Sequence, residues 1–205
     1  MPRMRIEHLV AGIIQTNVYL VMNEETKELI IIDPADDAKG IAEKITEMEG
    51  VPVAIFLTHG HFDHRLAANA LKEKYSVPVV ACGLEKEVLA LPPLWGVQAE
   101  DIDIDTEVSD NETINYAGFE IKVLHTPGHT VGSVCYYFPN EGALFSGDTL
   151  FRLSCGRTDL PTGSPKDMMK SIQRLLTSLP AETDVYPGHE GFTKIEIEQR
   201  YNPFA

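Results

Sequence analysis

Three histidines and one aspartate lie within six consecutive positions of the sequence Thr58-His59-Gly60-His61-Phe62-Asp63-His64. They directly follow residues 53–57, a short apolar run with β-branched side chains that predicts a buried strand. Imidazole nitrogens combined with a carboxylate suit borderline ions such as Zn²⁺, Fe²⁺ or Mn²⁺. Gly60 permits a tight turn, so that side chains this close in sequence can converge. The segment therefore predicts a metal site, and the alternative is a solvated histidine-rich loop.

Three later segments have the same construction. Residues 119–124, 143–145 and 184–186 each form an apolar, strand-like run, and each leads into a turn that contains glycine. The turns carry His129, Asp148 and His189 respectively. Open α/β sheets place their ligands at the carboxyl ends of strands. We therefore expect the side chains of all four segments to meet at one edge of the fold.

The four motifs HxHxDH, TPGHT, GDTLF and YPGHE, in that order, resemble those of the metallo-β-lactamase superfamily. Within it they are most similar to the glyoxalase II-like hydrolases. The resemblance extends from residues 17–20 through 31–34 to 201–204. It implies an α/β (α+β) fold, the four-layer αββα sandwich, formed by residues 1–205 as a single domain. Because the chain ends soon after His189, it resembles the short, single-domain members.

The resemblance also implies the ligands of two divalent metal ions, with Zn as the first expectation and Fe or Mn as alternatives. One ion would be held by His59, His61 and His129, and the other by Asp63, His64 and His189, with Asp148 as the bridge. Asp63 and Asp148 would thus be catalytic as ligands. In the family, Asp33 lies behind the metals as the acceptor for a ligating imidazole. The sequence alone leaves open that Asp33 caps a turn before the next helix.

The activity implied by the resemblance is hydrolysis of a thioester such as S-lactoylglutathione by a hydroxide bound to two metals. A thiolate departs without a strong general acid because thiols are acidic. Arg157, within Gly156-Arg157, would meet a glutathione carboxylate, or would instead pair with Asp159. The expected partner is a small-molecule thioester substrate. The position that holds cysteine in many metallo-β-lactamases is Asp148 here, which counts against antibiotic hydrolysis.

Three alternative functions remain open at this stage. A glutathione persulfide dioxygenase would hold a single non-haem iron with His59, His129 and Asp148. A lactonase or phosphodiesterase would use the same dinuclear site on an ester. A non-catalytic metal-binding module is the third alternative, although structural metal sites usually close with four ligands.

Periodicity and turn residues predict the elements that position these groups. Ser164 as N-cap and Pro165 at the first position mark the start of a long helix. Asp63 is a candidate N-cap for a helix over residues 65–75, a role compatible with metal ligation. The loop 91–96, which contains Trp95, is either a lid over the substrate or part of the core. Further strands are predicted at residues 6–14, 17–22, 28–32 and 77–81, and further helices at residues 38–49, 83–90 and 193–200.

Composition limits the classes of partner. The 205 residues suit one globular domain, and a net charge of −14 disfavours nucleic acid and anionic membranes. Cys82, Cys135 and Cys155 show no CxxC spacing, which favours a reducing compartment, and we expect a cytoplasmic protein without a membrane span. The sequence carries no signal that sets the oligomeric state.

Overall fold

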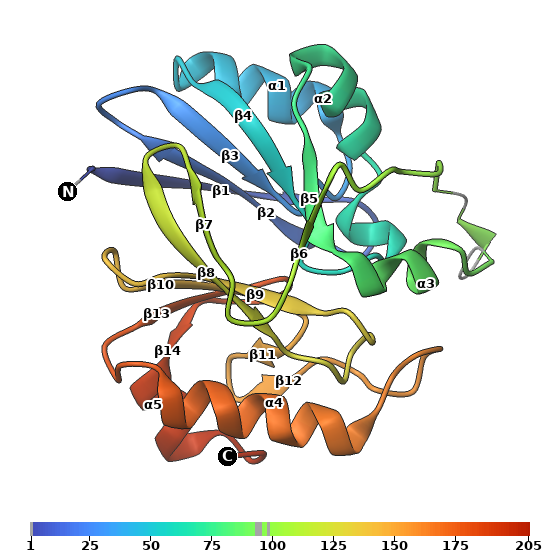
Figure 1. The fold of residues 1–205 in the computed structure, drawn as a ribbon, viewed down its shortest axis with the longest axis vertical. Helices are drawn as coiled ribbons and strands as arrows, with labels where there is room; N and C mark the ends of the chain where they lie inside the picture. Colours follow the sequence, from blue (N-terminus) through green and yellow to red (C-terminus); the bar gives the residue numbers. More distant parts are fainter. Residues whose placement is uncertain (1, 93–95, 98) are drawn as a thin grey trace.

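Two six-stranded sheets pack face to face in the computed structural model, which describes residues 2–92, 96–97 and 99–205 (Figure 1). The first sheet has the order β1-β2-β3-β4-β5-β6. Its strands are β1 (Met4–Ala11), β2 (Thr16–Asn23), β3 (Glu28–Ile32), β4 (Val51–Phe56), β5 (Val79–Cys82) and β6 (Thr106–Val108). The second sheet has the order β14-β13-β10-β9-β8-β7. Its strands are β7 (Thr113–Tyr116), β8 (Phe119–His125), β9 (Val134–Phe138), β10 (Ala143–Gly147), β13 (Asp184–Pro187) and β14 (Thr193–Lys194).

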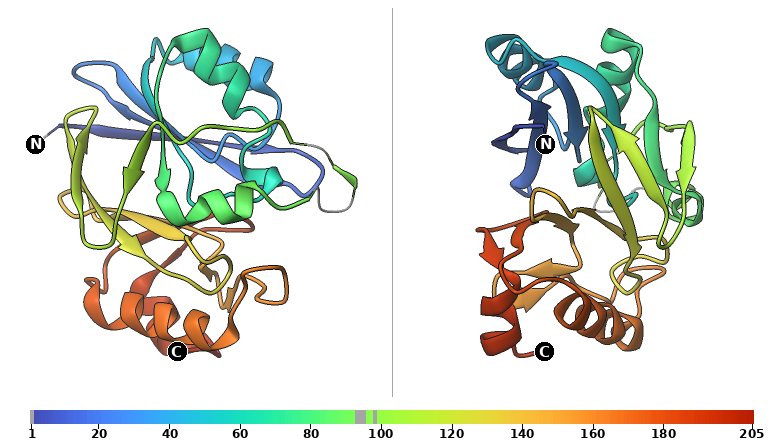
Figure 2. Two further views of the ribbon diagram at one scale, coloured as in Figure 1. Left: turned by 45° about the vertical axis from the view of Figure 1, so that its right-hand side comes forward. Right: turned by 60° about the vertical axis from the view of Figure 1, so that its left-hand side comes forward.

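Helices cover the outer face of each sheet, at opposite ends of the molecule (Figure 2). α1 (Ala38–Glu47) and α2 (Ala68–Tyr75) pack on the first sheet, and α4 (Pro165–Ser178) and α5 (Ile195–Tyr201) on the second. The remaining elements are short: η1 (Phe62–His64), η2 (Gly83–Glu85), α3 (Lys86–Leu89), and the hairpin of β11 (Leu150–Phe151) and β12 (Ser154–Cys155). The layers confirm the predicted αββα sandwich. No helix in the described ranges is long and apolar enough to cross a bilayer.

Strand β2 shows why the sequence folds into layers. All eight of its residues are buried, because both faces of the sheet are covered. Val18, Leu20 and Met22 point to the helices, whereas Tyr19 and Val21 point to the other sheet. This alternation follows from the two-residue period of a strand. The strand thus contributes to two of the three hydrophobic layers.

Helix boundaries confirm some sequence predictions and correct others. Ser164 caps α4 by accepting from the backbone N–H of Asp167, as predicted. Helix α2 begins at Ala68, not at residue 65, because the chain first makes the 3₁₀ turn η1. No side chain caps α2, so the alternative that Asp63 is its N-cap was wrong. Asp37 caps α1, and Asp33 does not. The lid-or-core alternative depends on Trp95, which lies outside the described residues.

Candidate metal centre

Two pairs of parallel strands bring the candidate ligands to one end of the sandwich. β3 pairs with β4 in parallel, with Ile32 opposite Phe56, so Asp33 and His59 emerge from the same edge. β10 pairs with β13 in parallel, with Gly147 opposite Pro187, so Asp148 and His189 emerge together as well. His129 follows β8 in the same sheet. The predicted convergence of strand ends is therefore present.

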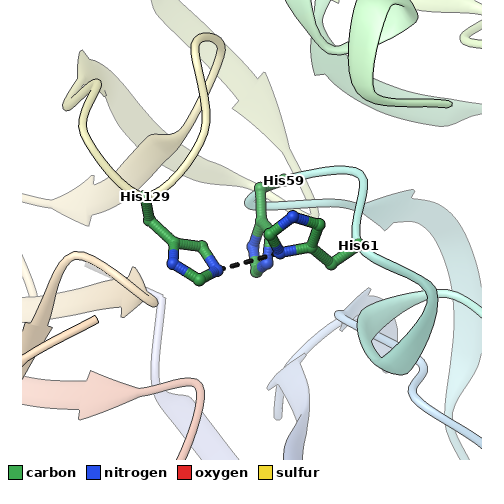
Figure 3. Close-up of side chains that lie close together, drawn as sticks. All are labelled: His59, His61 and His129. Carbon is green, nitrogen blue, oxygen red and sulfur yellow. Dashed lines mark hydrogen bonds between the residues drawn. The ribbon is translucent and has the colours of Figure 1, made fainter. Parts of the chain in front are cut away.

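His59, His61 and His129 form the first cluster (Figure 3). One ring nitrogen from each lies within 4.8 Å of the others, and all three residues are buried. His61 Nδ1 lies 2.9 Å from His129 Nε2. The Nε2 atoms of His59 and His61 are buried and have no hydrogen-bond partner among the described residues. Such orphaned buried nitrogens call for a ligand, because a buried polar atom without a partner is costly.

Asp63, His64 and His189 form the second cluster. Asp63 Oδ2 lies 3.4 Å from His64 Nε2 and 3.3 Å from His189 Nε2, and the two imidazole Nε2 atoms are 3.3 Å apart. Thr16 on β2 donates its hydroxyl to Asp63 Oδ2 at 3.1 Å. These atoms face one another closely enough to share one cation.

Asp148 lies between the two clusters. Its Oδ2 is 3.3 Å from His129 Nε2 of the first cluster and 3.4 Å from His189 Nε2 of the second. Its Oδ1 is 3.3 Å from His64 Nε2, although this contact is not aligned as a hydrogen bond and the oxygen is otherwise unpaired within the described part of the chain. One carboxylate thus contacts both clusters.

Hydrogen bonds to the Nδ1 atoms orient three of the imidazoles. His64 Nδ1 donates to Asp33 Oδ2 at 2.9 Å, and His129 Nδ1 donates to the carbonyl oxygen of Arg157 at 2.7 Å. The Thr58 hydroxyl donates to Asp33 Oδ2 and can accept from His59 Nδ1 at 3.1 Å. These partners assign the Nδ1 protons and leave each Nε2 as the ring nitrogen available to a metal ion.

Distances alone also group Asp33 with His59 and His64 as a possible metal site. However, both oxygens of Asp33 already accept hydrogen bonds, Oδ1 from the Thr58 N–H and Oδ2 from the Thr58 hydroxyl and His64. Asp33 is therefore an acceptor behind the imidazoles.

The electrostatics differ between the two clusters. Burial lowers the pKa of His59 well below its usual value and that of His61 to about 3, so these rings are neutral at pH 7. Burial opposes the charged form of His64 too, but Asp148, Asp63 and Asp33 outweigh it and raise its pKa. In the same way Asp148 and Asp63 overcome burial and raise the pKa of His189 to about 9. Despite their own burial, the nearby histidines hold the pKa of Asp63 at about 2 and keep that of Asp148 well below its usual value.

Glycine is required where the backbone passes Asp148. A Cβ on Gly188 would lie 2.2 Å from Asp148 Oδ1 and 2.7 Å from His64 Cε1. A Cβ on Gly156 would lie 1.9 Å from the Asp148 carbonyl oxygen. A side chain at Gly188 would therefore displace the Asp148 carboxylate, and one at Gly156 would displace the Asp148 backbone.

A cavity of about 470 Å³ opens over the site. Four of the candidate ligands line it, Asp63, His129, Asp148 and His189, together with the apolar residues Ile14, Phe151 and Leu160. Arg157 also lines it, and the Arg157 guanidinium makes a bidentate ion pair with Asp159 at 2.7 and 2.8 Å. The predicted Arg157–Asp159 bridge is thus present, in a position that borders the cavity.

The chain matches the model of the metallo-beta-lactamase superfamily over residues 11–189. It belongs to that superfamily. It is 35% identical to the Bacillus subtilis protein named "Probable metallo-hydrolase YqgX", covering 98% of this chain and 97% of that protein. It is 36% identical to a hydroxyacylglutathione hydrolase of Brucella anthropi, over 92% of this chain and 66% of that enzyme.

Solved structures agree with this assignment to the metallo-beta-lactamase superfamily. The BLEG-1 B3 metallo-beta-lactamase superimposes with a TM-score of 0.92 at 37% identity, covering 98% of this chain and 99% of that one. TTHA1623 in a di-iron-bound form superimposes with a TM-score of 0.85 at 36% identity, covering 97% of this chain and 100% of that one. ETHE1 from Myxococcus xanthus superimposes with a TM-score of 0.81 at 29% identity, covering 97% of this chain and 83% of that one. The chain therefore has the fold of this largely metal-hydrolase superfamily, with clusters of the residue types that bind metals.

Sequence reasoning missed three side chains that support the clusters. Thr58 links Asp33 to His59, Thr16 holds Asp63, and Glu85 ties two loops together. Thr58 directly precedes His59 at a strand end, and this position is a usable sequence signal. Glu85 had no such signal, because a glutamate at the start of a short predicted helix is usually a surface residue.

Proposed function

We propose that this protein is a metal-dependent hydrolase of thioesters of the S-lactoylglutathione type. The observation that carries the proposal is the position of Asp148, which contacts His129 of one cluster and His64 and His189 of the other. His59, His61 and His129 would hold one divalent ion, Asp63, His64 and His189 the second, and Asp148 both. Neutral imidazoles, carboxylates and orphaned Nε2 atoms suit Zn²⁺, Fe²⁺ or Mn²⁺.

Bound divalent ions would supply an activated water and polarise the substrate carbonyl. The chain's own residues do the rest. Asp33, Thr58 and the Arg157 carbonyl hold the imidazoles in one orientation, so the reacting centre is organised before substrate arrives. Ile14, Phe151 and Leu160 can exclude water from the acyl group. Arg157, which also lines the cavity, would pair with a carboxylate of the thiol carrier.

Hydrolysis of a thioester matches the chemistry that these residues and bound ions would supply. Attack at the carbonyl carbon breaks the carbon–sulfur bond, and the thiolate leaves without a strong acid to protonate it. The similarity to a hydroxyacylglutathione hydrolase supports this substrate class.

A second candidate is a glutathione persulfide dioxygenase with one iron. It is favoured by His129, which has a ring nitrogen within 4.8 Å of one of His59 and whose Nε2 lies 3.3 Å from Asp148 Oδ2. Two histidines and one carboxylate are a set typical of non-haem iron oxygenases. A relative of similar size at 36% identity is solved in a di-iron-bound form, which supports iron as a metal for this site but with two ions and not one.

The test is metal analysis of aerobically and anaerobically prepared protein, followed by assays with Zn²⁺, Fe²⁺ and Mn²⁺. Substrates are S-lactoylglutathione, a thioester lacking glutathione, a lactone, a phosphodiester, a β-lactam, and glutathione persulfide in an oxygen electrode. We expect two ions per chain and metal-dependent release of thiol without oxygen uptake. One iron per chain with persulfide-dependent oxygen uptake would establish the dioxygenase instead. Two bound ions without turnover of any thioester would refute the proposal.

A further inference from the structure

Glu85 is a buried carboxylate close to the first cluster. It is the last residue of η2, at the end of β5, and only 1% of its surface is exposed. It belongs to none of the groups of possible metal ligands found in the described residues. Burying a carboxylate is costly unless hydrogen bonds satisfy it, so the partners of Glu85 indicate what it does.

The contacts of Glu85 join the two segments that carry the first cluster. Its Oε2 accepts from the backbone N–H of Gly60, which lies between His59 and His61. Its Oε1 accepts from the Thr130 hydroxyl at 2.6 Å and from the Gly132 N–H at 2.8 Å. Thr130 directly follows His129. One carboxylate therefore ties the His59–His61 turn to the His129 loop.

Glycines at positions 60 and 132 allow the Glu85 carboxylate to approach both backbone segments closely. A Cβ on Gly60 would lie 2.9 Å from Glu85 Oε2, and a Cβ on Gly132 would lie 2.7 Å from Oε1. Glycine at both positions allows the close approach. The carboxylate and its two glycines form one fitted contact, which makes the distance between the loops specific.

We propose that Glu85 is a positioning residue that sets the separation of the His59–His61 turn from His129, and thereby the affinity of this cluster for metal. The inference depends on the metal site of the proposed function and not on its substrate. Glu85 acts through backbone and hydroxyl groups, without touching an ion or substrate.

The test is Glu85→Gln in an Asp63→Ala background, which disables the second cluster and leaves one ion per chain. Glutamine keeps the shape and can keep the bonds of Oε1, but its amide N–H₂ would face the Gly60 N–H, donor against donor. We expect the affinity for Co²⁺, measured by chelator competition, to fall about tenfold or more, with altered visible absorption of the bound Co²⁺. The measurement is made well below the unfolding temperature of each variant.

Glu198→Gln, in the same background, is the matched control. Glu198 is also fully buried and accepts three hydrogen bonds, from Thr193 Oγ1, Leu153 N and Asn202 Nδ2, but it ties α5 to the β11–β12 hairpin. We expect it to lose thermal stability while its Co²⁺ affinity and spectrum stay unchanged. Equal Co²⁺ affinity in both variants, whether retained or lost, would overturn the positioning role.

Thr130→Val is a second variant, for use if Glu85→Gln does not fold. It removes one donor to Glu85, so a smaller loss of Co²⁺ affinity in the same direction is expected, and an unchanged affinity would contradict the inference. If the Asp63→Ala parent binds no Co²⁺, the proposed metal site is refuted. If the parent binds Co²⁺ and the Glu85→Gln variant binds it equally well, only the positioning role of Glu85 is refuted.

Discussion

His64 and Asp33 form a fully buried pair, in which Nδ1 of the imidazole donates to Oδ2 of the carboxylate over 2.9 Å. The pair leaves His64 Nε2 directed at Asp63 and Asp148, 3.4 and 3.3 Å away. The residue that directly follows β3 thus orients a ligand-type side chain of η1, 31 positions later. This relationship motivates the first prediction.

Replacing Asp33 by asparagine should weaken metal binding at the second cluster. The amide cannot serve Thr58 and His64 as a carboxylate does, so His64 loses its orientation and part of its basicity. We expect a loss of metal affinity of about 10- to 100-fold, measured by chelator competition. Asp36→Asn is the control, because Asp36 bonds the backbone N–H of Asp37 and contacts neither cluster. Equal affinities of the two variants would refute the role of Asp33.

Asp148→Ala should lose the second metal and most of the activity. Asp148 contacts both clusters, so its removal leaves His64, His129 and His189 without their shared partner. We expect kcat/KM to fall by more than about 100-fold and the metal content to drop to one ion per chain or fewer. Elemental analysis after gel filtration checks the stoichiometry. Full retention of both ions would disprove bridging by Asp148.

Gly188→Ala should perturb the site by steric displacement alone. Its Cβ would lie 2.2 Å from Asp148 Oδ1, so either the carboxylate or the loop must move. We expect metal affinity to fall about tenfold or more. Gly191→Ala, in the same loop, is the matched control, because its Cβ would meet no atom within 4 Å. Similar metal affinities of the two variants would show that the close approach of Gly188 to Asp148 is not required.

Proton release should differ between the clusters at pH 7. His59 and His61 have lowered pKa values, the latter about 3, and need lose no proton to bind metal. His64 and His189 have raised pKa values, the latter about 9, so this cluster should release about two protons per ion. Titration calorimetry in buffers of different ionisation enthalpy measures the count, using His61→Ala and Asp63→Ala to isolate each cluster. Equal proton release at both clusters would contradict the assignment.

The raised pKa of His189 predicts how the stability of the metal-free protein depends on pH. The pKa of His189 is raised above its ordinary value of 6.5, so the folded state binds the extra proton. The stabilisation that this provides is fully present below pH 6.5 and is lost as the pH rises through about 9. Chelator-treated wild type should therefore lose more thermal stability between pH 7 and pH 10 than His189→Ala does. A parallel decline of the two proteins would show that His189 is not protonated in this way.

Arg157→Ala should distinguish substrate binding from a purely structural ion pair. Arg157 lines the cavity, and its guanidinium pairs with Asp159, an exposed contact with little effect on stability. We expect KM for S-lactoylglutathione to rise about tenfold, with little change for a thioester that lacks glutathione. Asp159→Asn, which removes the pair but keeps Arg157, serves as control. An equal loss on both thioesters would favour the structural role.

Residue types and their local spacing were enough to predict the ligand-type side chains at the strand ends, whereas the αββα layers were implied by the family resemblance. The seven ligand-type residues lie in turns that follow strand-like runs. Strand β2, whose residues are all buried, has the largely apolar run typical of a strand covered on both faces. These signals are local, since a strand's period of two and a glycine turn can be read within about ten residues. The α4 start at Ser164 and Pro165 was predictable for the same reason.

The tertiary structure decided which atoms support those residues. That Asp33 faces His64, and is not a helix cap, depends on the parallel pairing of β3 with β4 and on the η1 turn. That Glu85 joins Gly60 to Gly132 depends on contacts 25 and 47 residues apart. Such long-range contacts have no periodic signature in the sequence, because they arise only when separate strand ends are brought to the same edge of the folded sandwich.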